Sequence, residues 1–402
     1  MEDIVIVGGG QAATSLAEKL RALGADAPIT IIGEEPVPPY ERPPLSKAYL
    51  MGDYDKERLF LRPESIYAEK GITLRLGTRV TAIDPAARQV TTGDGETRPY
   101  GQLALVTGST PIRLPAAIGG DLDGVHTVRT LADIDAMSAK FTAGARALVV
   151  GGGYIGLEAA AVAAKLGLTV TLVEMAERIL GRVAAAETAD VIRAKHLAHG
   201  VDLREGVGLS RLEGGPTVTQ AELTDGTTLD VDFVIVGIGI RPETTLAEAA
   251  GIACDNGITV DAQGRTSVPN IWAAGDCSSF PYQGQHLRLE SVQNAIDQAE
   301  CVAANMLGGN TSYAPVPWFW SDQYDMKLQI AGLNTGYDRV VPRGEGNSLS
   351  HWYFVGDRFL AVDAINAPRD FMVGKRMLEA GKAVDAAVIS NPEADLKSLL
   401  RG

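Results

Sequence analysis

The residues of this sequence that are best suited to chemistry lie in two glycine-rich segments, each of which follows a short apolar run. In the first segment, Gly8, Gly10 and Ala13 form the pattern G-x-G-x-x-A, and Glu34 follows Ala13 by 21 residues. The first glycine permits a tight turn and the second lets the backbone approach a pyrophosphate, while Glu34 or Glu35 can accept hydrogen bonds from ribose hydroxyls. The spacing therefore predicts a dinucleotide site.

The second segment repeats this pattern. Gly151, Gly153 and Gly156 form G-x-G-x-x-G, and Glu174 follows Gly156 by 18 residues. A carboxylate there pairs with a free 2′-hydroxyl and repels a 2′-phosphate, which favours NADH over NADPH. Glu158 stands among apolar residues in what we expect to be the first turn of a helix. It either benefits there from the helix dipole or reaches towards the reacting end of a bound nicotinamide.

Both segments need a strand, a turn, a helix and a second strand to work. The apolar runs 4–7 and 148–150 predict the first strand of each unit. After the first glycines, Leu16, Leu20 and Leu23 recur on one face of a predicted helix. The stretch PITIIGEE then supplies a second strand that ends in acids. The pattern predicts an α/β fold with two Rossmann-like dinucleotide-binding domains.

Composition limits the class of protein. The chain has 402 residues, 46% of them hydrophobic and 21% charged, as expected for two or three compact domains. Its formal charge of −14 argues against nucleic acid and anionic membranes as partners. No uncharged apolar run reaches 18 residues and the N-terminus has no basic-then-apolar targeting segment, so we expect a cytoplasmic protein with no membrane span.

The cysteines and histidines suggest no metal site and no redox dithiol. Cys254, Cys277 and Cys301 form no C-x-x-C pair. His196 and His199 have helical spacing but no acidic or cysteine cluster beside them. We therefore expect them on a solvated helix face.

Two dinucleotide sites in one chain indicate two cofactors whose reactive rings meet. NADH delivers two electrons at once as a hydride, and a flavin can accept the pair and pass electrons onward singly. Such a protein needs orientation and a docking surface and does not need an acid–base triad. This accounts for the absence of a recognisable triad from the sequence.

The chain as a whole resembles the FAD-dependent, NADH-using ferredoxin reductases of bacterial oxygenase systems, the family of putidaredoxin reductase and of the reductase components of aromatic-ring dioxygenases. The resemblance rests on both glycine units and on further motifs. These are PYERPPLSK (39–47), LALVTGSTP (103–111), VIVGIGIRP (234–242), IWAAGDC (271–277), ESVQNAIDQA (290–299) and PWFWSDQYDMKLQIAG (317–332).

The resemblance implies a set of site residues. A Lys–Glu pair beside the flavin matches Lys47 and Glu158, the predicted catalytic residues. The matching FAD contacts are Gly8, Gly10, Ala12, Ala13, Glu34, Arg42, Lys47, Val80, Arg129, Asp276, Glu290, Ser291, Val292 and Trp320. The matching NADH contacts are Gly151, Gly153, Tyr154, Ile155, Gly156, Glu174, Arg182 and Gly239.

Taken alone, several of these residues have simpler interpretations. Lys47 reads as a surface lysine at a helix start, and Asp276 as a turn or N-cap aspartate. Arg129 could equally be an exposed arginine, and Trp320 a core aromatic.

The resemblance also implies domains and a partner. Residues 1–114 and 243–314 would bind FAD, residues 115–242 NADH, and residues 315–402 would form an α+β domain that presents a 2Fe–2S ferredoxin. That last segment holds 10 basic and 11 acidic residues in a strongly acidic chain, which lessens repulsion of an acidic ferredoxin. We expect a monomer or a weak homodimer. The candidate docking cations, which could equally be scattered solvated charges, are Arg369, Lys375, Arg376 and Lys382.

Four other classes share this architecture. Disulfide reductases need a redox cysteine pair early in the chain, and NADH peroxidases and oxidases need one cysteine where this chain reads PPLSKAYL. Both are disfavoured, because the first cysteine is Cys254. A rubredoxin reductase differs mainly in its acceptor surface, and a redox-signalling flavoprotein related to apoptosis-inducing factor remains a further alternative.

Overall fold

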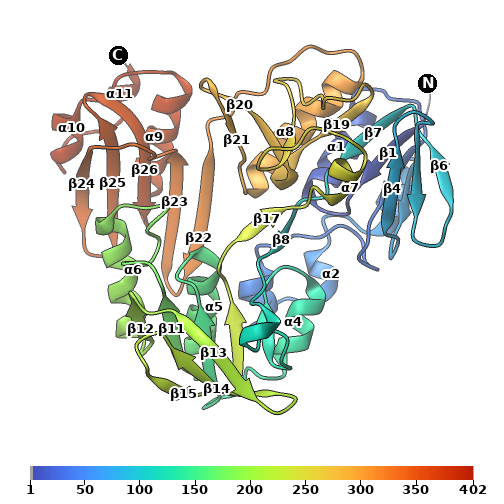
Figure 1. Cartoon of the computed structure of the whole chain (residues 1–402). Coiled ribbons are helices and arrows are strands. Elements are labelled where there is room, and N and C mark those ends of the chain that lie inside the picture. Colours follow the sequence, from blue (N-terminus) through green and yellow to red (C-terminus); the bar gives the residue numbers. More distant parts are fainter. Residues whose placement is uncertain (1–2, 402) are drawn as a thin grey trace. The chain divides into compact units, whose positions relative to one another are not determined.

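The computed structural model describes residues 3–401, and these form two compact units (Figure 1). The first unit comprises the chain up to residue 42, residues 55–110 and residues 240–315. The second comprises residues 43–54, 111–239 and the chain from residue 316. Each glycine segment lies in a different unit.

A five-stranded parallel sheet forms the centre of the first unit, in the order β19-β7-β1-β2-β3. Helices α1 and α8 pack against each other and against this sheet, because their apolar faces share one core with it. The elements concerned are β1 (Ile4–Val7), α1 (Gln11–Ala22), β2 (Ile29–Ile32), β3 (Ile72–Arg75), β7 (Gln102–Leu105), β19 (Ile271–Ala273) and α8 (Val292–Met306).

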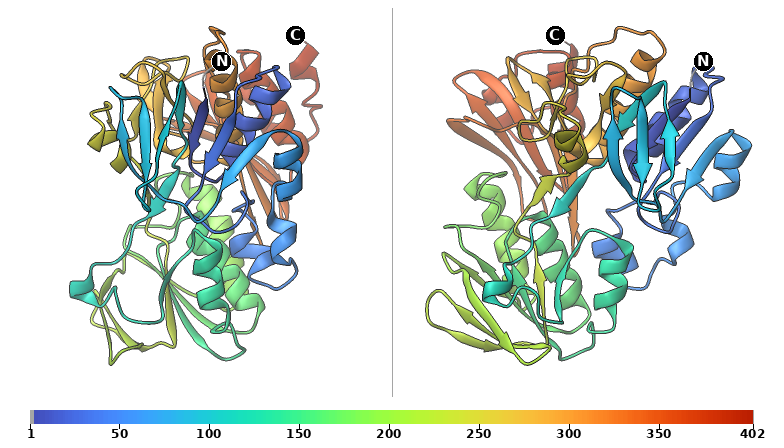
Figure 2. Two further views of the ribbon diagram at one scale, coloured as in Figure 1. Left: turned by 90° about the vertical axis from the view of Figure 1, so that its right-hand side faces the viewer. Right: turned by 45° about the vertical axis from the view of Figure 1, so that its right-hand side comes forward.

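A small antiparallel meander belongs to the same unit and appears in cyan in Figure 2. It consists of β4 (Val80–Asp84), β5 (Gln89–Thr92) and β6 (Thr97–Pro99). The other short elements are α2 (Lys56–Leu59), α3 (Glu64–Glu69), β8 (Ser109–Pro111), β17 (Ile240–Pro242), α7 (Thr245–Ala249), β18 (Ile258–Thr259), the 3₁₀ turn η3 (Gly275–Cys277), β20 (Ser278–Tyr282) and β21 (Gln285–Leu287).

The second unit repeats the parallel design with the order β12-β11-β10-β16-β9. Its strands are β9 (Val125–Thr127), β10 (Arg146–Val150), β11 (Thr169–Glu174), β12 (Asp202–Glu205) and β16 (Phe233–Val236). The helices are α4 (Leu131–Ser138), α5 (Tyr154–Lys165) and α6 (Ala186–Ala198), and a π-helical turn, η1 (Leu45–Tyr49), contacts α5. An antiparallel sheet of β13 (Leu209–Gly214), β14 (Val218–Leu223) and β15 (Thr228–Asp230) adjoins η2 (Ala116–Ile118).

A five-stranded antiparallel sheet completes this unit, in the order β22-β23-β26-β25-β24. Helix α9 packs on β23 and β26 around a core that contains Trp352, and β22 contacts α5 (Figure 1). The elements are β22 (Trp318–Gln323), β23 (Met326–Gly332), β24 (Arg339–Glu345), β25 (Ser348–Val355), β26 (Arg358–Ile365), α9 (Pro368–Glu379), α10 (Ala386–Ser390) and α11 (Ser398–Arg401).

The predicted fold class, two Rossmann-like domains with a C-terminal α+β part, is confirmed. The residue boundaries proposed for three domains stay a prediction. Among residues 3–401, no helix is both long enough and apolar enough to cross a membrane. Within the same range, no cluster of three or more His, Cys, Asp or Glu side chains could hold a metal ion.

Candidate functional site: two glycine turns and a buried lysine–glutamate pair

The first glycine turn leaves an open helix N-terminus. Gly8 has φ +123°, and a Cβ there would lie 2.2 Å from the Val106 carbonyl oxygen, so only glycine fits. Gly10 is the N-cap of α1, makes no side-chain cap, and would present a Cβ to open space. The first N–H groups of α1 therefore face a clear space with the positive end of the helix dipole behind them, which fits a dinucleotide pyrophosphate.

The two acids that follow β2 have different partners. Glu34 forms an exposed ion pair with Arg79 at 3.0 Å. Glu35 accepts hydrogen bonds from Arg42 at 2.7 Å and from the Tyr40 hydroxyl at 2.6 Å. Burial lowers the pKa of Arg42, but Tyr40 and Glu35 outweigh it and hold that pKa above its ordinary value. Glu34 is therefore the more exposed of the two carboxylates and keeps lone pairs for a ribose hydroxyl, while Glu35 fixes the Arg42 guanidinium.

The other predicted FAD residues of the first unit lie on several elements. Asp276 accepts a hydrogen bond from the Ser109 hydroxyl at 2.9 Å. Ser291 is the N-cap of α8 and accepts from the Asn294 N–H at 3.1 Å. Glu290 pairs with Arg288 at 2.5 Å, and Ala12, Ala13 and Val80 are buried. Val292 begins α8.

The second glycine turn repeats the geometry of the first. A Cβ on Gly151 would lie 2.4 Å from the Gly237 carbonyl oxygen, and one on Gly156 would lie 2.0 Å from the Gly151 carbonyl oxygen, so helix and strand meet at backbone contact. Gly153 is the N-cap of α5, again without a side-chain cap and with open space where a Cβ would stand. This turn too fits a dinucleotide pyrophosphate.

Glu174 stabilises that turn from the end of β11. Its Oε2 accepts from the Gly152 N–H at 2.7 Å, and its Oε1 accepts from the Ala176 N–H at 2.8 Å. A carboxylate held in this way keeps lone pairs for a ribose hydroxyl, because each oxygen can accept more than one hydrogen bond.

Four further predicted NADH contacts lie in the second unit, and the predicted FAD contact Arg129 lies there too. Ile155 is exposed, and the exposed Arg182 has its Nη2 3.8 Å from where a Cβ of Gly239 would stand. The ring of Tyr154 lies 4.8 Å from that of Phe319. The half-exposed Arg129 leads into α4, and its backbone N–H donates to Asp133.

Lys47 and Glu158 form a buried ion pair. Lys47 Nζ lies 2.9 Å from Glu158 Oε1, and Glu158 is 3% exposed. Ser321 donates to the same oxygen at 2.7 Å, and Ser46 donates to Oε2 at 3.0 Å. Burial raises the pKa of Glu158, while the Lys47 ammonium and the hydroxyl donors act in the opposite direction. The surface-lysine interpretation of Lys47 therefore fails, because its side chain is largely buried against a carboxylate.

Two expectations about this region are wrong. Helix α5 begins at Tyr154, so Glu158 lies beyond the first turn, and its oxygens take side-chain donors instead of capping the helix. His196 does not lie on a solvated face, because it is fully buried and hydrogen-bonded to Gln323. His199 is exposed, as expected.

Ser46 and Ser321 were not singled out from the sequence, although each adjoins a residue that was. Ser46 precedes Lys47 in PPLSK, and Ser321 follows Trp320 in PWFWSDQ. Their position next to predicted site residues was the one feature of the sequence that could have indicated a role for these serines. Their convergence on one carboxylate could not be read from residues so far apart in the chain.

Trp320 belongs to an aromatic cluster on β22. Its ring lies 5.6 Å from Trp318 and 6.4 Å from Phe319, and all three are half-buried. Lys375 of α9 lies over the Trp318 ring at 5.8 Å and pairs with Glu379 at 3.0 Å. The cluster therefore connects α9 to the strand that carries Ser321.

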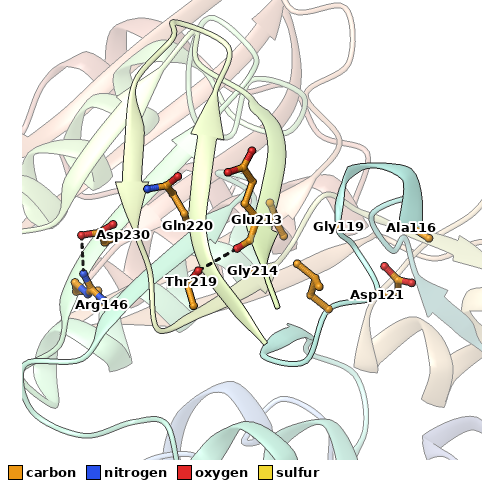
Figure 3. Close-up of a pocket in the computed structure, with 11 residues that line it drawn as sticks. Ala116, Gly119, Asp121, Arg146, Glu213, Gly214, Thr219, Gln220 and Asp230 are labelled. Carbon is orange, nitrogen blue, oxygen red and sulfur yellow. Dashed lines mark hydrogen bonds and ion pairs between the residues drawn. The ribbon is translucent and has the colours of Figure 1, made fainter. Parts of the chain in front are cut away.

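A separate open hollow lies between the β13–β15 sheet and η2 (Figure 3). It contains no predicted site residue. Its lining includes the acids Asp121, Glu213 and Asp230, and Arg146 is already paired with Asp230 at 3.2 Å. An acidic lining of this kind does not suit a phosphate-containing cofactor.

Comparison with known proteins agrees with this geometry. Residues 2–299 match the pyridine nucleotide-disulphide oxidoreductase family, and residues 318–400 match the reductase C-terminal family. A ferredoxin–NAD(P)+ reductase of Sphingomonas is 44% identical, with 99% of this chain and 97% of that protein covered. The ferredoxin–NAD+ reductase component of an anthranilate 1,2-dioxygenase system from Burkholderia cepacia is 41% identical, with 99% of each covered.

Solved structures give the same result. The chain superposes on the reductase in the covalent putidaredoxin reductase–putidaredoxin complex with a TM-score of 0.96 at 40% identity, covering 100% of this chain and 98% of that one. The resemblance drawn from the sequence motifs is thereby confirmed. This chain belongs to the pyridine nucleotide-disulphide oxidoreductases and, among them, to the ferredoxin–NAD(P)+ reductases, which use FAD and a nicotinamide dinucleotide.

Proposed function

We propose that this chain oxidises NADH and reduces, one electron at a time, a 2Fe–2S ferredoxin that supplies a monooxygenase or a Rieske dioxygenase. The observation that carries the proposal is the pair of glycine turns at Gly10 and Gly153, each ending in an uncapped helix N-terminus. When bound, FAD accepts two electrons from NADH as a hydride and releases them singly.

The glycine turn of the first unit binds FAD, and that of the second binds NADH. The N–H groups of α1 hold one pyrophosphate and Glu34 binds its ribose, while Arg42 is aimed by Glu35. The N–H groups of α5 hold the NADH pyrophosphate. Glu174 binds the adenosine ribose and repels a 2′-phosphate, so that NADH is the preferred donor.

The Lys47–Glu158 pair supplies a fixed ammonium group in a site with little water. The carboxylate aims the ammonium, and the two charges balance each other, so no net charge is buried. We assign to this pair the orientation of the reacting end of the nicotinamide. No proton transfer is required of either group.

Three features support a ferredoxin as the acceptor. The relatives include a dioxygenase-system reductase and a reductase captured with its redoxin. Trp320 lies in a half-buried aromatic cluster that continues to Lys375. The C-terminal segment is almost neutral in an acidic chain, which lowers repulsion of an acidic partner. We propose that this docking takes place in the cytoplasm, with the chain as a monomer or a weak homodimer.

We also propose a division into three domains. The FAD domain would comprise residues 1–114 and 243–314, the NADH domain residues 115–242, and the acceptor domain residues 315–402. The match of residues 318–400 to a separate family supports the last of these.

The test is NADH-driven reduction of cytochrome c with purified 2Fe–2S ferredoxins and rubredoxins added one at a time. A ferredoxin should accelerate the reaction strongly above the rate with reductase alone. Acceleration by rubredoxin only would identify the acceptor as rubredoxin. Slow NADH oxidation that no redoxin accelerates would instead favour the signalling flavoprotein.

A further inference from the structure

A continuous chain of hydrogen bonds runs from Glu158 through Ser321, Gln323 and His196 to Tyr324. Ser321 Oγ lies 2.7 Å from Glu158 Oε1, and Gln323 Nε2 lies 3.2 Å from Ser321 Oγ. His196 Nε2 lies 2.8 Å from Gln323 Oε1, and the Tyr324 hydroxyl lies 3.1 Å from His196 Nδ1. Ser321, Gln323 and His196 are at most 3% exposed, so water does not compete for these bonds.

The chemistry of the groups fixes the direction of every bond. An ionised Glu158 can only accept, so the single hydroxyl proton of Ser321 must point to it. Ser321 can then only accept from its other neighbour, which requires the NH₂ group of Gln323 on that side. The Gln323 oxygen therefore faces His196, whose Nε2 must carry the proton.

The outer end of the chain agrees with this direction. Burial lowers the pKa of His196 to about 4, so the ring is neutral near pH 7 and has one donor and one acceptor nitrogen. With Nε2 protonated, Nδ1 accepts from the Tyr324 hydroxyl. All four donors thus point towards Glu158, and the His196 tautomer is set by the charge of a carboxylate three bonds away.

The strand geometry shows that the outer end is held in place. Tyr324 has φ +56° in the two-residue turn between β22 and β23, a region that tyrosine rarely adopts. Its ring stacks on His199 at 3.8 Å, and Lys195 pairs with Asp325 at 2.5 Å beside it. Lys195 of α6 and His199, the residue that follows this helix, thus hold the strained turn against the buried histidine.

We propose that Gln323 and His196 are positioning residues that hold the Ser321 hydroxyl as a donor to Glu158 and so keep Glu158 ionised against Lys47. Their effect on the reaction rests on the function proposed above. Asp322 of β22 lies 4.0 Å from Lys47 Nζ and competes with Glu158 for the ammonium. A second donor, Ser46 from η1, acts on the other oxygen of Glu158.

The first test measures the tautomer directly. The oxidised holoprotein is labelled with ¹⁵N-histidine, and the five histidines are resolved by their long-range couplings. The resonances missing from His196→Gln identify His196. We expect a neutral ring protonated at Nε2 that does not titrate between pH 5.5 and 8. An Nδ1–H tautomer, or titration near pH 6.5, would overturn the proposed chain.

The second test measures the ionisation of Glu158 itself. Infrared spectra of the oxidised holoprotein are recorded across pH, and the carboxylic acid C=O band of Glu158 is identified by its absence from Glu158→Gln. In Gln323→Leu, the Ser321 hydroxyl is free to turn, and the midpoint of that band should rise by about one pH unit, a tenfold change. Ser321→Ala is a smaller change that removes the Ser321 hydroxyl itself, and it should raise the midpoint by at least as much.

Gln285→Leu is the matched control, because it makes the same side-chain change at an exposed position of β21 that takes no part in these hydrogen bonds. Its midpoint should equal that of the wild type. If Gln323→Leu folds and leaves the midpoint unchanged while Ser321→Ala raises it, the positioning role is wrong. If neither variant shifts the midpoint, the hydrogen bond from Ser321 does not stabilise the ionised Glu158, and the proposal is wrong. Neither measurement involves turnover. Both therefore test the hydrogen-bond chain even if the protein does not reduce ferredoxin.

Discussion

Glu158 and Glu174 show at the level of single residues how neighbours determine what a carboxylate does. Glu158 is buried, its pKa is raised by that burial, and its partners are an ammonium and two hydroxyls. Glu174 is half-exposed, and its partners are backbone N–H groups of the glycine turn. The first is suited to aiming a cation and the second to holding a turn and a ribose.

Exchange of Glu174 for Arg should shift the preference between the two nicotinamide dinucleotides towards NADPH. The change replaces a group that repels the 2′-phosphate with one that attracts it, so the ratio of kcat/KM for NADPH to that for NADH should rise roughly tenfold or more. Some activity with both donors should be lost, because the bonds to Gly152 and Ala176 disappear.

Glu177→Arg makes the same charge change three residues further on, at an exposed position, and serves as the control. Steady-state rates with each dinucleotide give the comparison. Equal use of NADH and NADPH by the wild-type protein would contradict the assigned role of Glu174.

Replacement of Cys254, Cys277 and Cys301 by Ser or Ala should leave NADH-to-ferredoxin activity largely intact. All three thiols are free, and burial raises the pKa of each, that of Cys254 to about 11, so none is a ready nucleophile. Loss of the buried Cys277 thiol should lower stability by about 1 kcal/mol. The rate of NADH-to-ferredoxin electron transfer is measured in the triple variant with its flavin bound. Complete loss of turnover in folded protein would restore the disulfide-reductase interpretation.

At the level of elements, the contact between α6 and the turn that follows β22 combines a buried histidine with a strained backbone. His196 donates a hydrogen bond to Gln323 and accepts one from Tyr324 but loses hydration, and the net effect is a lowered pKa. The folded protein therefore binds fewer protons at this site than the unfolded chain does between pH 4 and pH 6.5. Its contribution to stability is complete above pH 6.5 and is lost as the pH falls towards 4.

His196→Gln should consequently flatten the dependence of stability on pH. Between pH 6.5 and 5.5, the wild type should lose about 1 kcal/mol more than the variant does, because one pKa unit corresponds to about 1.4 kcal/mol. Asp363, whose burial raises its pKa to about 6, has the opposite slope but is present in both proteins and cancels in the difference. Thermal unfolding of both holoproteins across this range measures the effect, and parallel curves would contradict it.

At the level of the whole molecule, charge is distributed unevenly along the chain. The segment from residue 315 has one net negative charge, whereas the chain as a whole has fourteen. Within that segment, Lys375 is paired with Glu379 and lies over Trp318, while Arg376 is exposed. An acidic ferredoxin would be repelled least by this segment.

Charge reversal at Lys375 and Arg376 should slow ferredoxin reduction most at low ionic strength, because salt screens exposed charges. Roughly a tenfold loss at low salt that shrinks at high salt is expected, with flavin reduction by NADH unchanged. Trp320→Ala should impair ferredoxin reduction more than reduction of ferricyanide, which needs no protein interface. Anaerobic rapid mixing separates these half-reactions.

Arg211→Glu, in β13, is the control for an equivalent charge change outside the C-terminal segment. It should leave the salt dependence of ferredoxin reduction as it is in the wild type. An unchanged salt dependence in the Lys375 and Arg376 variants would mean that the docking face lies elsewhere.

The sequence by itself determined the two dinucleotide units and, through its motifs, the family. This was possible because a glycine turn, the helix it starts and the acid that ends the next strand lie within a few dozen residues of one another, so Gly8 to Glu34 is a local pattern. The cofactors follow from that local chemistry. The precise assignment of each contact to FAD or NADH remains a prediction.

Only the tertiary structure decided which groups surround Glu158 and what becomes of His196. The donors to Glu158 come from residues 46, 47 and 321, and the partners of His196 come from the end of β22 and the turn that follows it. No spacing rule connects segments more than a hundred residues apart. Helical periodicity predicted the same exposure to solvent for His196 and His199. In the folded protein His196 is buried and hydrogen-bonded, whereas His199 is exposed to water.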